Sequence, residues 1–179
     1  MNNAGISAMV PAMECSLGQW QTMMAVNLTA PLLLMQYALA HMRAQGWGRI
    51  VNISSISGLR AGTGRLAYGT SKAGLIAMTS QFAIEAAAWG VTVNSIAPGP
   101  VDTPLALANH STETRSTYVD MVPMRRYGAP DEIADGIVFL CSEQASYITG
   151  QTLAIDGGFV AAGILVHELY DKSPSLQAS

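Results

Sequence analysis

The sequence contains few charged residues, and this scarcity limits the kinds of protein that it can encode. Only 12% of the 179 residues are charged, whereas 50% are hydrophobic. The formal net charge is −3, and the nine Lys and Arg residues are scattered along the chain. A nucleic-acid surface requires clustered positive charge, and a disordered chain requires low hydrophobicity. The composition therefore predicts a globular protein without a nucleic-acid partner, and one that buries further surface against another chain.

Cysteines and long apolar runs are also scarce. Cys15 and Cys141 are the two cysteines and form no CxxC motif, which predicts structural thiols in a reducing compartment. The richest apolar segment, APLLLMQYALAHM, is interrupted by Pro31, Gln36 and His41 and is shorter than the about 18 to 20 residues that span a bilayer. The N-terminus has neither the basic nor the apolar region of a secretory signal. We therefore expect a cytoplasmic protein with no membrane partner.

Helical and strand patterns alternate along a chain that has no internal repeat. The expected elements are a helix over 16–46 that Pro31 should kink or divide, a strand over 48–54, a helix over 67–89, a strand over 91–97, a helix over 131–143 and a strand over 152–156. Between them lie a glycine-rich loop over 56–66 and a polar segment over 105–128 that predicts short helices and mobile loop. This alternation predicts an α/β fold with parallel strands, right-handed crossovers and helices on both faces of one sheet.

Four polar residues stand where they could support chemistry. Tyr68 and Lys72 are four residues apart at the start of the helix over 67–89, so both project from one face. A nearby cation lowers the pKa of a tyrosine, which could then exchange a proton with an alcohol or carbonyl oxygen. Ser55 follows a strand, at the edge where parallel sheets bind ligands. Asn27 lies within a helix, where its amide indicates a hydrogen-bonding role.

The remaining candidates predict ordinary structural roles. His41, His110 and His167 have no spacing typical of metal ligands, so we expect surface or core histidines and no metal site. Gly62 and Gly64 form G-x-G without a strand-turn-helix context, which indicates loop flexibility near the substrate rather than a phosphate cradle. Taken alone, Tyr68 and Lys72 could also be an ordinary pair of residues on a helix surface. The motifs of the chain must therefore be considered together.

Five ordered motifs together resemble the short-chain dehydrogenase/reductase family. They are NNAG at 2–5, VNL around Asn27, the set Ser55, Tyr68 and Lys72, the turn IAPGPVDTP at 96–104, and YITGQTLAIDGG at 147–158. The resemblance covers essentially residues 1–160. It implies an incomplete three-layer Rossmann-type sheet, doubly wound and parallel, over residues 1–162, with 163–179 as a partly disordered tail. The implied activity is reversible hydride transfer between NAD or NADP and a secondary alcohol or ketone.

The resemblance also implies a role for each matching residue. Tyr68 would be the general acid/base, with a pKa lowered by Lys72, which would also bind the nicotinamide ribose. Ser55 would orient and polarise the substrate carbonyl, and Asn27 would hold a water that links Lys72 to solvent. The positions implied to contact the cofactor are Asn3, Ala4, Gly5, Tyr68, Lys72, Pro98, Gly99, Val101 and Thr103. The segment from about 105 to 127 would be a lid over the substrate, which could be a sugar acid, a polyol or a 3-oxoacyl thioester. A homodimer or homotetramer would form through the helices over 16–46 and 67–89.

The family's glycine-rich turn, G-x-x-x-G-x-G, does not precede NNAG in this sequence. The resemblance therefore implies an N-terminally truncated chain, corresponding to the C-terminal two-thirds of the family's domain. Loss of a phosphate-binding helix N-terminus predicts weak cofactor binding, and the strand after Gly48 is expected to lie at a sheet edge. Three explanations stay open: a fragment of a longer gene, a natural short protein stabilised by self-association, and a catalytically inactive binding module.

Overall fold

The centre of the molecule is a parallel sheet. The structure is a computed structural model that describes residues 1–171, so the last eight residues of the predicted tail, 172–179, lie outside it. Its three strands have the order β1–β2–β3 and span β1 Gly48–Ile53, β2 Val91–Pro98 and β3 Thr152–Ile155. Gly48 is opposite Val91, and Ser95 is opposite Thr152. All three strands occur where the sequence patterns predicted them.

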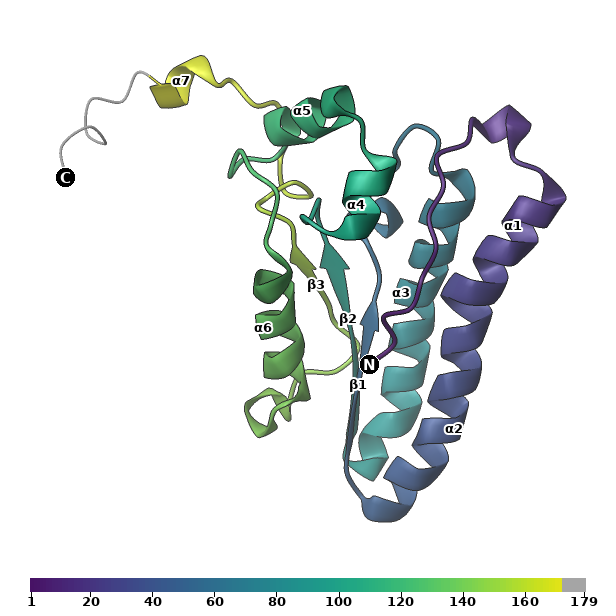
Figure 1. Cartoon of the computed structure of the whole chain (residues 1–179). Coiled ribbons are helices and arrows are strands. Elements are labelled where there is room, and N and C mark those ends of the chain that lie inside the picture. The colour runs from purple at the N-terminus through teal and green to yellow at the C-terminus, as the bar shows by residue number, and fades with distance from the viewer. Residues whose placement is uncertain (172–179) are drawn as a thin grey trace.

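Helices cover both faces of this sheet. In chain order they are α1 Leu17–Met24, α2 Ala30–Gln45, α3 Leu66–Ala86, α4 Pro104–Asn109, α5 Thr112–Met121, α6 Pro130–Cys141 and α7 Glu168–Asp171. Helices α2 and α3 lie on one face of the sheet and α6 lies on the other, while α4 and α5 sit above the carboxyl ends of the strands (Figure 1). The predicted three-layer α/β fold is therefore confirmed, and the polar segment over 105–128 does contain short helices.

The first long helix changes its winding just before Pro31. Ser16 caps α1 in a capping box with Gln19, and a π-helical turn over Ala25–Thr29 then joins α1 to α2. The wider turn contains a bond from the Ala30 amide to the Ala25 carbonyl, five residues back. A proline ring clashes with the carbonyl four residues before it in a regular α-helix. The predicted kink or division is thus replaced by a local change of winding within one continuous helix.

This continuous helix also corrects the expectation drawn from the apolar runs. Over Leu17–Gln45 it is long and apolar enough to cross a membrane, with a mean hydropathy of 1.4 in its most apolar window. The expectation from the sequence rested on the segment APLLLMQYALAHM alone. One side of the helix nevertheless packs Met35 and Leu39 against Ile50 of β1 and Ala83 of α3. A helix that covers a protein core meets the same composition test.

The opposite face of the sheet is covered by α6. Its side chains Ile133, Ile137 and Leu140 pack with Val51 and Ile96 in a second apolar cluster. These three positions recur at spacings of four and three residues, which is one face of an α-helix. From its apolar side chain and its place in the helix over 131–143, Val138 is also expected on this inner face, and that prediction is wrong: Val138 is 68% exposed. It follows Ile137 directly, and consecutive helix residues point about 100° apart.

The N-terminal segment lies along the outer side of β1. The Asn2 amide donates to the Val51 carbonyl at 2.9 Å, and the Ile53 amide donates to the Asn2 carbonyl at 2.9 Å. Further on, Val10 forms a parallel bridge with Arg65, just before α3. The predicted edge strand is therefore paired at its carboxyl end, and this pairing brings the NNAG turn to the mouth of the sheet.

Candidate active site

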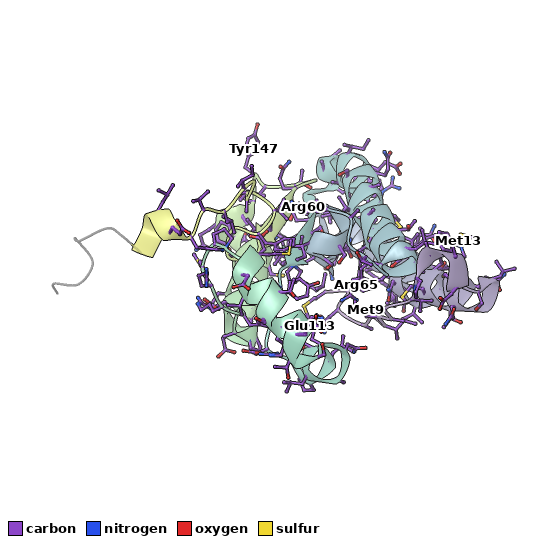
Figure 2. The ribbon with its side chains drawn as sticks, turned by 90° about the horizontal axis from the view of Figure 1, so that it is seen from above. Met9, Met13, Arg60, Arg65, Glu113 and Tyr147 are labelled. Atoms are coloured by element: carbon purple, nitrogen blue, oxygen red, sulfur yellow. The ribbon has the colours of Figure 1, made fainter. Side chains whose placement is uncertain are left out.

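A pocket of about 440 Å³ opens at the carboxyl ends of the strands. Figure 2 looks down on this end of the molecule. Nine of the predicted site residues line the pocket: Asn3, Gly5, Ser55, Tyr68, Lys72, Pro98, Gly99, Val101 and Thr103. The other two do not: Ala4 is exposed, and Asn27 is fully buried behind the pocket wall. Parallel sheets bind ligands at this edge because the loops that follow successive strands converge there.

Tyr68 lies in the first turns of α3 and reaches the serine that follows β1. Burial of its side chain raises the pKa of Tyr68, and the hydrogen bond of its hydroxyl with Ser55 opposes this rise. The positive charge of Arg65 also lowers the pKa. The expectation that Lys72 would lower it is not met here: burial dominates, the pKa of Tyr68 lies above its ordinary value, and the opposing groups are Ser55 and Arg65. Tyr68 therefore holds its proton at neutral pH.

Lys72 lies one turn further along α3 and is almost completely buried. Its Nζ donates to the carbonyl of Ile53 at 2.8 Å and lies 5.9 Å from the centre of the Tyr68 ring. Burial lowers the pKa of Lys72 to about 8, because desolvation penalises the charged form. The ammonium group is thus held at the end of β1, beside the tyrosine, in a position set by strand and helix together.

The lowered pKa of Lys72 predicts how stability depends on pH. Between pH 8 and the ordinary value of 10.5, the unfolded state binds more protons at Lys72 than the folded state, so the free energy of unfolding rises with pH. We expect wild type to gain stability relative to Lys72→Met across this window, measured by urea denaturation at each pH. The comparison cancels groups that titrate in both proteins. A difference that stays constant with pH would contradict the burial of a charged Lys72.

Asn27 connects the N-terminal turn to α3. Its Oδ1 accepts a bond from the Ile6 amide at 2.9 Å, and its Nδ2 donates to the Ile6 carbonyl at 2.9 Å and to Ser71 Oγ at 3.1 Å. A Cβ atom at Gly5 would lie 3.3 Å from Asn27 Oδ1 and 3.4 Å from Lys72 Nζ. Glycine at this position therefore lets the NNAG turn pass close to both polar side chains without displacing them.

The loop after β2 forms the opposite wall of the pocket. Gly99 donates its amide to the Ile155 carbonyl at 2.9 Å, and a Cβ at Gly99 would lie only 2.7 Å from Asp156 Cα. Val101 forms a parallel bridge with Gly128. Thr103 caps α4 by accepting a bond from the Ala106 amide at 3.1 Å. These close backbone approaches shape one wall of the pocket.

The pocket also contains residues that sequence reasoning did not select. Arg65, Ser7, His110 and Tyr118 all line it, although His110 was expected to be an ordinary surface or core histidine. Arg65, Tyr68 and Lys72 have the spacing i, i+3, i+7, which is one helix face, so the Tyr68 motif could have pointed to Arg65. Ser7, His110 and Tyr118 carry no such signal, because they come from separate segments that only the tertiary fold brings together.

The fold is a parallel α/β sheet of the Rossmann type with a pocket at the carboxyl ends of its strands, and comparison with known proteins identifies the family. The sequence model described as "Enoyl-(Acyl carrier protein) reductase" matches residues 1–160. The chain therefore belongs to this family of short-chain dehydrogenases/reductases, and the resemblance noted from its motifs is confirmed.

Individual relatives agree with this assignment. The chain is 44% identical over 158 residues to the 3-oxoacyl-[acyl-carrier-protein] reductase FabG of Aquifex aeolicus, covering 88% of this chain and 63% of that protein. Among solved structures, a gluconate 5-dehydrogenase of Burkholderia cenocepacia in complex with NADP and tartrate superposes with a TM-score of 0.87 at 31% identity, covering 90% of this chain and 64% of that one. A 4-hydroxyisoleucine dehydrogenase mutant complexed with NADH and succinate has a TM-score of 0.87 at 35% identity, with coverage of 91% and 68%. The chain thus spans somewhat less than two thirds of the first two of these relatives.

Proposed function

We propose that this protein is an NAD(P)-dependent oxidoreductase that interconverts a secondary alcohol and a ketone in a small molecule. The observation that carries the proposal is the convergence of Ser55, Tyr68 and Lys72, from a strand end and a helix start, on one pocket. The named activities of the relatives support it, since they include 3-oxoacyl reductases and dehydrogenases of hydroxy acids. We place the reaction in the cytoplasm, where two free cysteines would stay reduced.

In this proposal the nicotinamide of the bound cofactor supplies or accepts the hydride, and the side chains handle the proton. Tyr68, protonated at neutral pH, donates its proton to the carbonyl oxygen during reduction and recovers one in the reverse direction. Ser55 donates a second hydrogen bond to the same oxygen and so favours the charge that develops there. Lys72 would hold the nicotinamide ribose beside Tyr68, and Asn27 positions the N-terminal turn beside Lys72.

The cofactor site proposed here is that of the nicotinamide end. Gly5 and Gly99 both line the pocket, and a Cβ at either position would press against neighbouring residues. Asn3, Ala4 and Val101 would complete this wall, and Thr103 would hold the start of α4 over it. The donor set does not distinguish NAD from NADP, because the group that differs is at the adenosine end of the cofactor.

A titration of the purified chain with NADH and NADPH tests the proposal against a non-catalytic binding module. Binding is followed by quenching of tryptophan fluorescence or by calorimetry, and turnover by nicotinamide absorbance with a panel of ketones. Saturable binding accompanied by turnover supports the oxidoreductase. Undetectable binding of both cofactors at millimolar concentration would instead favour the binding module.

We further propose self-association through α2 and α3. Leu33, Leu34 and Tyr37 on α2 are 59%, 57% and 72% exposed, and Ile84 on α3 is 73% exposed. Large apolar side chains gathered on neighbouring helices are typical of a surface that another chain covers. A second copy fits best, because homo-oligomers bury the same patch on both subunits.

A charge placed in this patch is expected to dissociate the oligomer. Leu34→Glu would bury an unpaired carboxylate in the interface, and we expect it to weaken association at least about 10-fold. Light scattering coupled to size-exclusion chromatography measures the mass, and Gln21→Glu on exposed α1 serves as the control. A wild-type chain that is monomeric at high concentration would rule out the proposed interface.

A further inference from the structure

We infer that Arg65 binds an anionic group, most simply a carboxylate, on the substrate of the proposed reaction. This inference rests on the proposed function and adds a substrate class to it: short oxo and hydroxy acids rather than neutral ketones and alcohols. Arg65 lies at the start of α3, one turn before Tyr68, and lines the same pocket. Figure 2 shows Arg65 close to Met9 of the N-terminal segment.

Arg65 is a buried cation, only 9% exposed. Its Nη1 donates to Ser7 Oγ at 2.7 Å, and its Nη2 lies 3.4 Å from His110 Nε2. The bridge between Val10 and the backbone of Arg65 fixes the position from which the side chain extends. The guanidinium is thus held by uncharged partners on both sides, and contacts within the protein fix its position.

Within residues 1–171, no carboxylate neutralises this charge. The ion pairs of that part of the chain use Arg49, Arg115, Arg125 and Arg126, and none uses Arg65. The residues that line the pocket include Arg65 and Lys72 but no Asp or Glu. Burying an unpaired charge is costly, and buried charges in proteins are normally paired. A pocket with two cations and no anion is therefore complementary to a negatively charged ligand.

His110 does not neutralise Arg65, because an imidazole is either neutral or positively charged. Burial and the charges of Arg65 and Arg115 all lower the pKa of His110, so the ring is neutral at pH 7. A neutral ring can accept a bond from Arg65 at Nε2 and donate from Nδ1 to the Tyr127 hydroxyl, which is 3.0 Å away. This arrangement orients the guanidinium without neutralising it.

The guanidinium is also close enough to the reacting position to act on a small substrate. Its Cζ lies 5.5 Å from the centre of the Tyr68 ring. A guanidinium has five N–H donors in a planar fork, which suits the two oxygens of a carboxylate. The contacts with Ser7 and His110 use two of these donors within the described residues. A short acid could therefore place its carbonyl at Tyr68 and its carboxylate at Arg65.

Esterification removes the negative charge of a keto acid and leaves its ketone unchanged, which allows the inference to be tested. We would compare acetoacetate and levulinate with their methyl esters in wild type, Arg65→Gln and Arg65→Lys. In Arg65→Gln we expect the ratio of kcat/KM for each acid to kcat/KM for its methyl ester to fall about 10- to 100-fold, mainly through the KM of the acid. Arg65→Lys should recover part of the loss, because it keeps the charge but not the fork.

Arg60→Gln is the matched control, since Arg60 lies near the same mouth but bonds to the Phe159 and Ala162 carbonyls. It removes the same charge outside the pocket and should leave the preference for acids unchanged. Affinity for NADPH should also be unchanged in Arg65→Gln, because Arg65 is assigned to the substrate and not to a cofactor phosphate. A purely structural role for Arg65 would lower activity towards acids and esters equally, and that result would overturn the inference.

Binding measured directly separates this inference from the proposed function. Levulinate and methyl levulinate are titrated against each variant and followed by ligand-observed NMR. Levulinate binding that is lost in Arg65→Gln supports the anion site even if no ketone is turned over, in which case only the oxidoreductase proposal fails. Turnover with equal preference for acid and ester would leave the oxidoreductase intact and reject the anion site. Equal binding of both ligands to wild type, or no binding of levulinate, would also reject it.

Discussion

Tyr68→Phe is expected to lower turnover by about 10²- to 10⁴-fold while leaving the protein folded and able to bind its cofactor. The substitution removes one hydroxyl, which is the atom that the proposed mechanism requires for proton transfer. The ring that remains still fills the space between Ser55 and Arg65. Steady-state kinetics with NADPH and a ketone substrate measure the loss, and circular dichroism reports the fold.

A second tyrosine provides the control for this experiment. Tyr147 is fully exposed, far from the pocket-lining residues, and Tyr147→Phe removes the same atom without touching the site. It should match wild type in both turnover and stability. If Tyr68→Phe retained more than about a tenth of the wild-type rate, proton transfer by Tyr68 could not be the mechanism, because general acid catalysis contributes at least about 100-fold.

Asn27→Ala is expected to have the largest effect on stability. Asn27 is completely buried, and its amide makes four hydrogen bonds: two with the Ile6 backbone, one with Ser71 and one with Met23 Sδ. Removing it leaves partners unpaired and opens a small cavity, so we expect a loss of about 2 to 4 kcal/mol in the free energy of unfolding. Chemical denaturation measures this loss.

The effect should extend to the active site, because Ile6 follows the NNAG turn. Without the Asn27 amide, Ile6 loses the hydrogen bonds that hold the adjacent Gly5 turn near Lys72. Cofactor affinity should therefore fall as well. Gln21→Ala, at an exposed position of α1, is the matched control and should change stability by less than about 0.5 kcal/mol. Wild-type stability in Asn27→Ala would show that the N-terminal turn is held by other contacts.

Local patterns in the sequence were sufficient to predict most of the framework. The β-branched runs that became β1 and β2, the small residues of α3 and the ordered motifs around Tyr68 indicated the fold and the family. The burial of individual side chains was predicted less well, because it depends on which elements pack against them. Val138 is apolar but lies outside the core, because the sheet contacts a narrower face of α6 than the pattern suggested.

The pKa of Tyr68 is a second property that the sequence did not predict. Its spacing from Lys72 correctly put both groups on one helix face and one pocket wall. Spacing contains no information on desolvation, and burial raises the pKa of Tyr68 more than the nearby polar groups lower it. In the same way, burial and not a partner charge sets the pKa of Lys72.

The sequence by itself determined the alternation of strands and helices, the set Ser55, Tyr68 and Lys72, and the family, because these depend on residue type and spacing along the chain. Only the tertiary structure decided which cations lie inside the pocket and which partners they have. Arg65 is a candidate ligand-binding residue because Ser7 and His110, from distant segments of the chain, lie beside it in the pocket. The physical reason is that charge and solvation depend on distances in space, which residue spacing fixes only within a single helix or strand.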